Sequence, residues 1–287
     1  MSFDYTLEQI ESLRDIRYHR TPDRRATTEE QALAFVDEVG FCFLFGDAGV
    51  EIPTLWGAVA GSRRAMPHDH FDRDVGRTWE WKDSLPTRGA VYYGKLLRGK
   101  PTLASLDLLP AFYALTPNYG DVDDYLLQYE EGKLSVEAKN VYEALLNEGA
   151  LATSRLRQVS GLPGGGDNAR RFERALTELQ AEMKIVKVGI SDANRWGYAY
   201  VYDLFLRRFS DVPEAARRIS EEEAMTTLLT RHLRNVVAVP EASAKRLFRW
   251  EPWEWDRVVE RAATQSLILR DVRVDGIKGR CLATTDV

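Results

Sequence analysis

The sequence predicts a mainly α-helical protein with small β-hairpins (class α+β), built from several small units in tandem. One order of elements, namely a helix, a short helix, a longer helix and a hairpin, is indicated in the middle of the chain and again in its last third. A single hydrophobic core rarely grows beyond about 250 to 300 residues. The chain has 287 residues, so several cores packed together are favoured over one large domain.

The N-terminal part of the chain has clear signals only near its beginning. Apolar residues at helical spacing predict one helix at residues 7–16 and another at 29–39. The aromatic segment 40–46 is too short for a helix and predicts a buried strand. Beyond it the pattern is mixed, with a polar loop at 63–77 and a helix near 106–115. We therefore predict a mainly helical region, in which the pattern does not assign every element.

The middle of the chain has the sharpest pattern. Ser135 begins a capped helix, and Thr153 caps a short second helix that ends at Val159. A Pro/Gly loop leads into a third helix at about 168–183. The runs IVKVGI and WGYAYVYDL follow, joined by the turn-prone segment SDANR, which predicts a β-hairpin. This order of elements is typical of a winged helix.

The last third repeats that order. Ser220 caps a helix, Pro240 and Pro252 precede two more, and LILRDVRVDGIKGRCLA alternates like a β-ribbon with a DG turn. We therefore predict tandem winged-helix units packed together. The expected divisions are a helical, winged-helix-like region at 1–130, a central winged helix at 131–210 and a C-terminal winged helix at 211–287.

Composition limits the classes of function. The formal charge of −5 and the pI of about 5.6 argue against a protein coated in positive charge, so any DNA site must be a local basic face. No stretch approaches the roughly 18 apolar residues of a membrane span, and the N-terminus lacks the apolar region of a secretion signal. The two cysteines, Cys42 and Cys281, have no metal-site spacing. We expect a cytoplasmic protein without membrane contact or cofactor.

The third helix of the central unit carries the first candidate DNA-binding residues. A winged helix places its recognition helix at this position, and arginine bonds both guanine edges and phosphates. The candidates on this helix are Asn168, Arg170, Arg171 and Arg174, and those of the following hairpin are Lys184, Lys187 and Arg195. The alternative interpretation is a solvated helix face, which accounts for many arginine clusters.

The segment AVYYGKLLRGK carries the second group. Aromatic and basic residues alternate there, a combination that stacks on an exposed base and neutralises the adjacent phosphate. The candidates are Tyr92, Tyr93, Lys95, Arg98 and Lys100. Alternatively the two tyrosines belong to the core, which burial statistics favour.

Two further groups of residues are not predicted to bind a ligand. His68, Asp69, His70, Asp72 and Asp74 include metal-ligand types, but adjacent ligands on one loop rarely close a site, so no metal is predicted. Large aromatic residues mostly bury their area, and we therefore expect the tryptophans to lie in the core. They are Trp79, Trp81, Trp250, Trp253 and Trp255.

A family resemblance rests on several segments between about Gly40 and Arg280. They are GFCFLF, IPTLWGAVAG, WKDSLP, YYGKLLRGKPTL, LSVEAKNVYEALLNEGALATSRLR and RALTELQ. The sequence resembles the AlkZ/YcaQ-type winged-helix superfamily, particularly its AlkZ-related branch. Known members are DNA glycosylases that excise alkylated or crosslinked bases and surround a DNA channel with tandem winged helices. The resemblance implies DNA binding and makes glycosylase activity a candidate.

The catalytic motif of those glycosylases is missing at the expected place. It is Gln-x-Gln or Gln-x-Asp after a Gly-apolar pair, and here the two positions fall on Cys42 and Leu44. Neither side chain can hold a water or stabilise the sugar cation that forms as a base leaves. Asp47 or Glu51 could substitute if the register differs. The chain is also expected to end before the C-terminal β-barrel that such enzymes often have.

Three functions remain open at this stage. The first is a non-catalytic protein that binds double-stranded DNA, including damaged DNA. The second is a divergent DNA glycosylase that uses an unrecognised acid or amide. The third is a winged-helix module that binds another protein, which the acidic pI permits.

Overall fold

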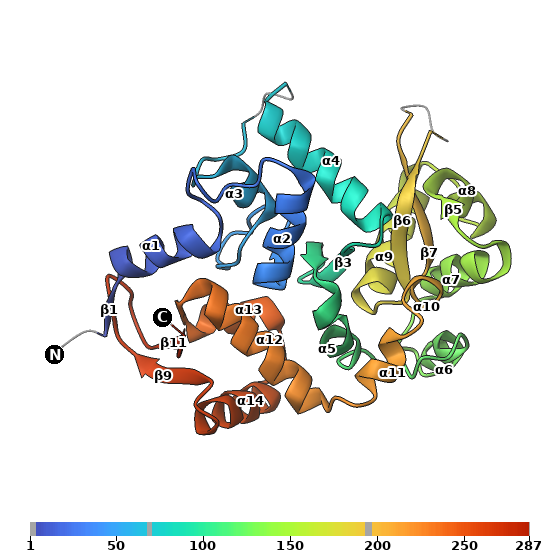
Figure 1. Cartoon of the computed structure of the whole chain (residues 1–287). Coiled ribbons are helices and arrows are strands. Elements are labelled where there is room, and N and C mark those ends of the chain that lie inside the picture. Colours follow the sequence, from blue (N-terminus) through green and yellow to red (C-terminus); the bar gives the residue numbers. More distant parts are fainter. Residues whose placement is uncertain (1–3, 68–70, 193–196, 287) are drawn as a thin grey trace.

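Three small antiparallel sheets, one in each of three units along the chain, organise the fold (Figure 1). The computed structural model describes residues 4–67, 71–192 and 197–286. Within these residues, each unit contributes three helices and a three-stranded sheet in one order: helix, strand, helix, helix, strand, strand. Within the described residues, no helix has both the length and the apolar character needed to cross a bilayer.

The first unit follows the short helix α1 (Leu7–Arg17). Its elements are α2 (Glu29–Val39), β2 (Phe41–Phe43), α3 (Leu55–Ala60), α4 (Arg73–Thr87), β3 (Tyr92–Leu97) and β4 (Lys100–Ala104). Thr28 and Gln31 form a capping box at the start of α2, and Gly40 with φ 77° ends it. The strand order is β2-β4-β3, so the last strand is central.

The second unit begins at Ser135, whose hydroxyl accepts a hydrogen bond from the Ala138 backbone N–H. Its elements are α7 (Val136–Glu148), β5 (Leu151–Ala152), α8 (Thr153–Val159), α9 (Gly166–Ala181), β6 (Ile185–Ser191) and β7 (Ala199–Leu204). The strand order is β5-β7-β6, so again the last strand is central. The expected helices and hairpin of this region are therefore present.

The third unit begins with a capping box between Ser220 and Glu223. Its elements are α12 (Glu221–Val236), β8 (Ala238–Pro240), α13 (Glu241–Phe248), α14 (Pro252–Thr264), β9 (Ile268–Val272) and β11 (Cys281–Thr284). The strand order β8-β11-β9 matches the other two sheets. Between its last two strands, β10 (Val274–Asp275) pairs in parallel with β1 (Tyr5–Thr6), which brings the two ends of the chain together.

Short elements connect the units and share a core with them. These are η1 (Leu106–Leu108), α5 (Leu109–Tyr113), α6 (Asp124–Glu130), α10 (Phe205–Arg208) and α11 (Val212–Ala216). The largest apolar cluster joins Phe41 and Phe43 of β2 to Phe112 of α5 and to Phe248 and Trp255 of the third unit. The same cluster also takes in Val186 of β6, so all three units contribute to it, and the first and second units each have a further core of their own.

The structure corrects three sequence-based expectations. Helix α4 begins inside the expected polar loop at 63–77. Ala152, not Thr153, is the N-cap of α8, because the Thr153 hydroxyl donates to the Tyr200 carbonyl at 2.8 Å. Two expected core tryptophans are exposed: the accessible fraction of the residue is 42% for Trp79 and 59% for Trp253.

Candidate nucleic-acid interface

The third helix of the second unit, α9, has one buried and one exposed face. Phe172, Leu176 and Leu179 repeat at helical spacing and lie in the core of the unit. The opposite face exposes three arginines, namely Arg170, Arg171 and Arg174. Asn168 in the first turn is partly buried.

The beginning of α9 attracts anions. Its N-cap is Gly165, so no side chain satisfies the first-turn N–H groups, and the partial positive charge of the helix end faces outward. Arg171 is held by Glu137, whose carboxylate accepts from Nε at 2.7 Å. Arg170 and Arg174 form no ion pair within the described ranges, although the charge of Arg174 helps Arg171 to lower the pKa of Glu137. The exposed face of α9 therefore presents Arg170 and Arg174 behind an uncapped helix start, a combination suited to phosphate despite the exposed Asp167 of the first turn.

Two residues of the expected contact zone in the hairpin of the second unit are not at the surface. Lys184 is buried, and its ammonium donates to the Asn118 side-chain oxygen at 2.6 Å. Lys187 is also buried and forms an ion pair with Asp83 of α4. The prediction that these two lysines contact DNA is therefore dropped. The third candidate of this zone, Arg195, lies outside the described residues.

The Asp83 carboxylate is the centre of a buried polar cluster between α4 and the β6–β7 hairpin. Besides Lys187, it accepts hydrogen bonds from Lys82 Nζ at 2.6 Å and from the Tyr198 hydroxyl at 2.7 Å. The Lys187 ammonium also lies 3.6 Å from the centre of the Tyr200 ring, a cation–π contact. Burial and the nearby charge of Lys82 lower the pKa of Lys187 to about 8.

The β3–β4 hairpin supplies fewer exposed groups than expected. Tyr92 and Tyr93 are buried, so the core interpretation of these tyrosines is the right one. Lys95 is partly buried. Arg98 Nε donates to Asp47 at 2.8 Å, and Lys100 Nζ lies 3.2 Å from the other oxygen of that carboxylate. Of these three cations, Lys100 keeps the most exposed side chain.

The positions that correspond to the glycosylase motif lie in the core of the first unit. Cys42 pairs in register with Leu103 and packs with Leu44 under α2, α3 and α4. Because successive side chains of a strand point to opposite faces, Phe41 and Phe43 enter the other core instead. Burial raises the pKa of the Cys42 thiol far above its ordinary value. Cys42 and Leu44 therefore have access to neither water nor substrate.

The two alternative carboxylates lie on the loop between β2 and α3, and each is beside a cation. The hydrogen bond from Arg98 holds the pKa of Asp47 below its ordinary value. Glu51 lies 3.4 Å from Arg14. Their negative charge is thus largely compensated within the protein.

Comparison with known proteins places the chain in a family. Residues 26–249 match the family described as AlkZ related. The chain belongs to the AlkZ-related family. No curated protein matches it significantly.

The AlkZ-related chain is also similar to one solved structure, the DNA glycosylase AlkZ of Streptomyces sahachiroi. The TM-score is 0.57 at 13% sequence identity, and the match covers 98% of this chain and 70% of that one. At this identity the likeness concerns the fold, namely helices with small antiparallel sheets.

No group of three or more His, Cys, Asp or Glu side chains that could hold a metal is found in the part of the AlkZ-related chain that is described. His68, Asp69 and His70 lie outside that part. Asp72 caps α4 and binds Arg64, and Asp74 binds Arg25 and Arg64, so both carboxylates are engaged by the protein.

Sequence reasoning missed the polar cluster around Asp83. The adjacent pair Lys82 and Asp83 lies within the segment WKDSLP, which supports the family resemblance but carries no pattern of its own for a polar cluster. Nothing in the local pattern shows that Lys187 is its partner, because the two segments are 104 residues apart.

Proposed function

We propose that this AlkZ-related chain is a double-stranded DNA-binding protein of three winged-helix units that lacks the base-excision chemistry of a glycosylase. Each unit has the helices and the terminal two-stranded hairpin of a winged helix, and α9 occupies the recognition-helix position of the second. The observation that carries the proposal is the exposed face of α9, where Arg170 and Arg174 form no ion pair and the helix start is uncapped.

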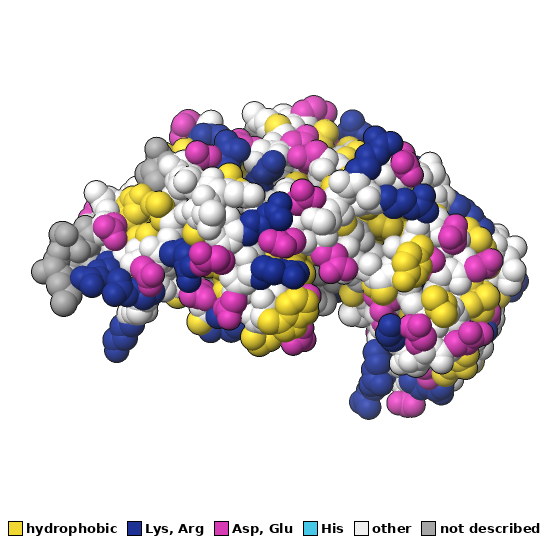
Figure 2. Space-filling model, turned by 90° about the horizontal axis from the view of Figure 1, so that it is seen from below, with side chains coloured by type: hydrophobic (Ala, Val, Ile, Leu, Met, Phe, Trp, Pro, Cys, Tyr) yellow, Lys and Arg dark blue, Asp and Glu magenta, His cyan; other side chains and the backbone are white. Residues whose placement is uncertain are grey.

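The shape of the molecule is compatible with a bound duplex. Figure 2 shows a curved outline with a notch between the half that contains the second unit and the other half, and Lys and Arg side chains project from both halves. Because the net charge is −5, contact with DNA depends on such local groups rather than on the whole surface. The similarity to a DNA glycosylase supports DNA, including damaged DNA, as the partner.

A salt titration tests this proposal. Affinity for a short labelled duplex is measured by fluorescence anisotropy between low and moderate salt. If the protein neutralises phosphates, the logarithm of the binding constant falls with the logarithm of salt concentration, by about 0.9 per phosphate contact. Absence of binding at low salt would contradict the proposal. Binding of another protein without DNA binding would favour the interaction-module alternative.

A divergent glycosylase is the second candidate, because Asp47 and Glu51 lie on the loop directly after the strand that holds the motif positions. Release of a base from alkylated DNA, lost in Asp47→Asn or Glu51→Gln, would establish it. The compensating cations Arg98 and Arg14 argue against it, since a paired carboxylate has less charge to offer a sugar cation.

A further inference from the structure

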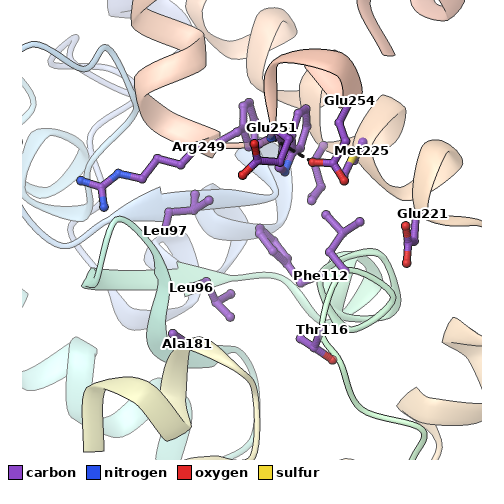
Figure 3. A pocket seen from close by; sticks show the side chains of 14 residues that line it. Leu96, Leu97, Phe112, Thr116, Ala181, Glu221, Met225, Arg249, Glu251 and Glu254 are labelled. Carbon is purple, nitrogen blue, oxygen red and sulfur yellow. Dashed lines mark hydrogen bonds between the residues drawn. The ribbon is translucent and has the colours of Figure 1, made fainter. Parts of the chain in front are cut away.

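A cavity of about 370 Å³ lies where the three units meet (Figure 3). Leu97 of β3 comes from the first unit, Ala181 at the end of α9 from the second, and Met225 of α12 from the third. Phe112 of the connecting helix α5 completes this wall. The volume is within the range of small-molecule sites, about 300 to 1,000 Å³.

Aromatic rings form another part of the lining. Phe248 at the end of α13 stacks on Trp250, with ring centres 4.3 Å apart and planes 18° from parallel. Trp250 in turn contacts the buried Trp255 at 5.9 Å, which fixes its orientation. Rigid aromatic faces favour a flat apolar body, and their negative π-faces attract a cation.

Three carboxylates determine the charge that the cavity accepts. Glu221 begins α12, and Glu251 and Glu254 belong to the first turn of α14 and its cap. Glu254 Oε2 accepts from the Glu251 backbone N–H at 2.9 Å. None of the three has an ion pair within the described part of the chain, although Glu251 and Glu254 cap the start of α14 and Glu221 and Glu251 are exposed. In Figure 3 the guanidinium of Arg249 points away from them.

We propose that this cavity binds a small organic cation, namely an ammonium group carried on an aromatic body. The ring would stack against the apolar wall, and the ammonium would face the three carboxylates, which have no ion pair with a cationic side chain. The same negative charge repels phosphate, so this site does not use the arginines of α9 and does not depend on DNA binding.

Three probes of nearly equal shape test the charge preference on the full chain: 3-phenylpropylammonium, 3-phenylpropanol and 3-phenylpropionate. Affinities are measured by isothermal titration calorimetry or by chemical-shift titration. We expect the cation to bind most tightly, the alcohol more weakly and the anion most weakly. Equal affinity of the three, or preference for the anion, would overturn the proposal.

Variants locate the site. In Glu254→Gln the side chain keeps an oxygen acceptor for the Glu251 N–H, so the helix start is preserved while one charge is removed. Affinity for the cation should fall about two- to fivefold, with the alcohol unaffected. Asp256→Asn, an exposed change on the same helix outside the cavity, is the matched control and should alter neither.

Ala181→Trp tests whether the probes occupy this cavity, and it does so without changing the charge of the lining. Ala181 is exposed at the end of α9, so a bulky substitute there narrows the cavity without disturbing a core. All three probes should then bind more weakly. Binding that is insensitive to both Ala181→Trp and Glu254→Gln would place the ligand elsewhere and refute the site.

Discussion

Asp83 of α4 and Lys187 of β6 form a buried ion pair across the boundary between the first and second units. Lys82 and the Tyr198 hydroxyl also donate hydrogen bonds to the same carboxylate. Helix α4 also packs directly on β6. The Asp83 carboxylate therefore ties the third helix of the first unit to the hairpin of the second, in addition to their direct packing.

The first prediction is that Asp83→Asn destabilises the protein strongly. The substitution leaves two buried ammonium groups facing an amide, and removing one partner of a buried ion pair costs about 3 to 5 kcal/mol. The free energy of unfolding from urea denaturation measures this. Asp256→Asn, an exposed change of the same type, should shift it by less than about 0.5 kcal/mol. A loss below about 1 kcal/mol for Asp83→Asn would mean that the cluster contributes little to stability.

The second prediction concerns the pH dependence that Lys187 contributes. Its pKa is about 8 in the folded protein and near 10.5 in the unfolded chain, so the unfolded chain binds more protons between these values. The contribution of Lys187 to stability must therefore rise with pH across that window, by up to about 1.4 kcal/mol per pH unit. The difference in unfolding free energy between wild type and Lys187→Met isolates this slope from other titrating groups.

The control for that slope is Lys278→Met, which removes an exposed lysine. Its difference from wild type should stay constant over the same pH range. If the wild-type and Lys187→Met curves were parallel between pH 8 and 10, Lys187 would be an ordinary lysine in the folded protein.

The Asp83 cluster also shows where sequence patterns stop being informative. Helix α4 buries Thr78, Lys82 and Asp83 along with Val75 and Leu85, so the apolar repeat that reveals a helix is interrupted. By contrast, the second and third units could be predicted from the sequence. The capping interactions of Ser135 and Ser220 join residues that lie within four positions of each other along the chain.

The candidate interface likewise has one part that the sequence predicts and one part that it does not. The exposed arginines of α9 follow from position within the unit and from a regular apolar face. Lys187 was expected at the surface because charge usually predicts exposure, yet a distant carboxylate allows its burial. Local rules cannot anticipate a partner 104 residues away.

The third prediction is that His232 limits stability in acid. This side chain is fully buried beside Phe248, and burial lowers its pKa to about 3. The unfolded chain takes up a proton near pH 6.5 and the folded protein does not, so stability falls as pH decreases between 6.5 and 3. Relative to wild type, His232→Leu should gain about 1.4 kcal/mol per pH unit between 6 and 4. A pH-independent difference between the two proteins would show that His232 does not titrate in this way.

The fourth prediction is that Arg170→Ala combined with Arg174→Ala weakens duplex binding. Each lost base contact should cost about 1 to 3 kcal/mol, and each lost phosphate contact should reduce the salt slope by about one unit. Arg217→Ala with Arg218→Ala removes two exposed arginines of the segment that follows α11 and serves as the matched control. If both double variants bind alike, with circular dichroism unchanged, α9 is not the contact surface.

The last prediction is that the protein releases no base from alkylated DNA above the uncatalysed rate, even where it binds that DNA. Excision requires a group that stabilises the sugar cation more than the ground state, usually an amide or carboxylate that holds a water. Cys42 and Leu44 lie under three helices in the core of the first unit, where burial keeps the thiol neutral. Substituting glutamine at Cys42 would therefore bury an amide in an apolar core rather than restore a site, and should destabilise the fold without producing activity. Release by the wild type, abolished in Asp47→Asn or Glu51→Gln, would instead show that the loop after β2 is catalytic and that the motif register is shifted.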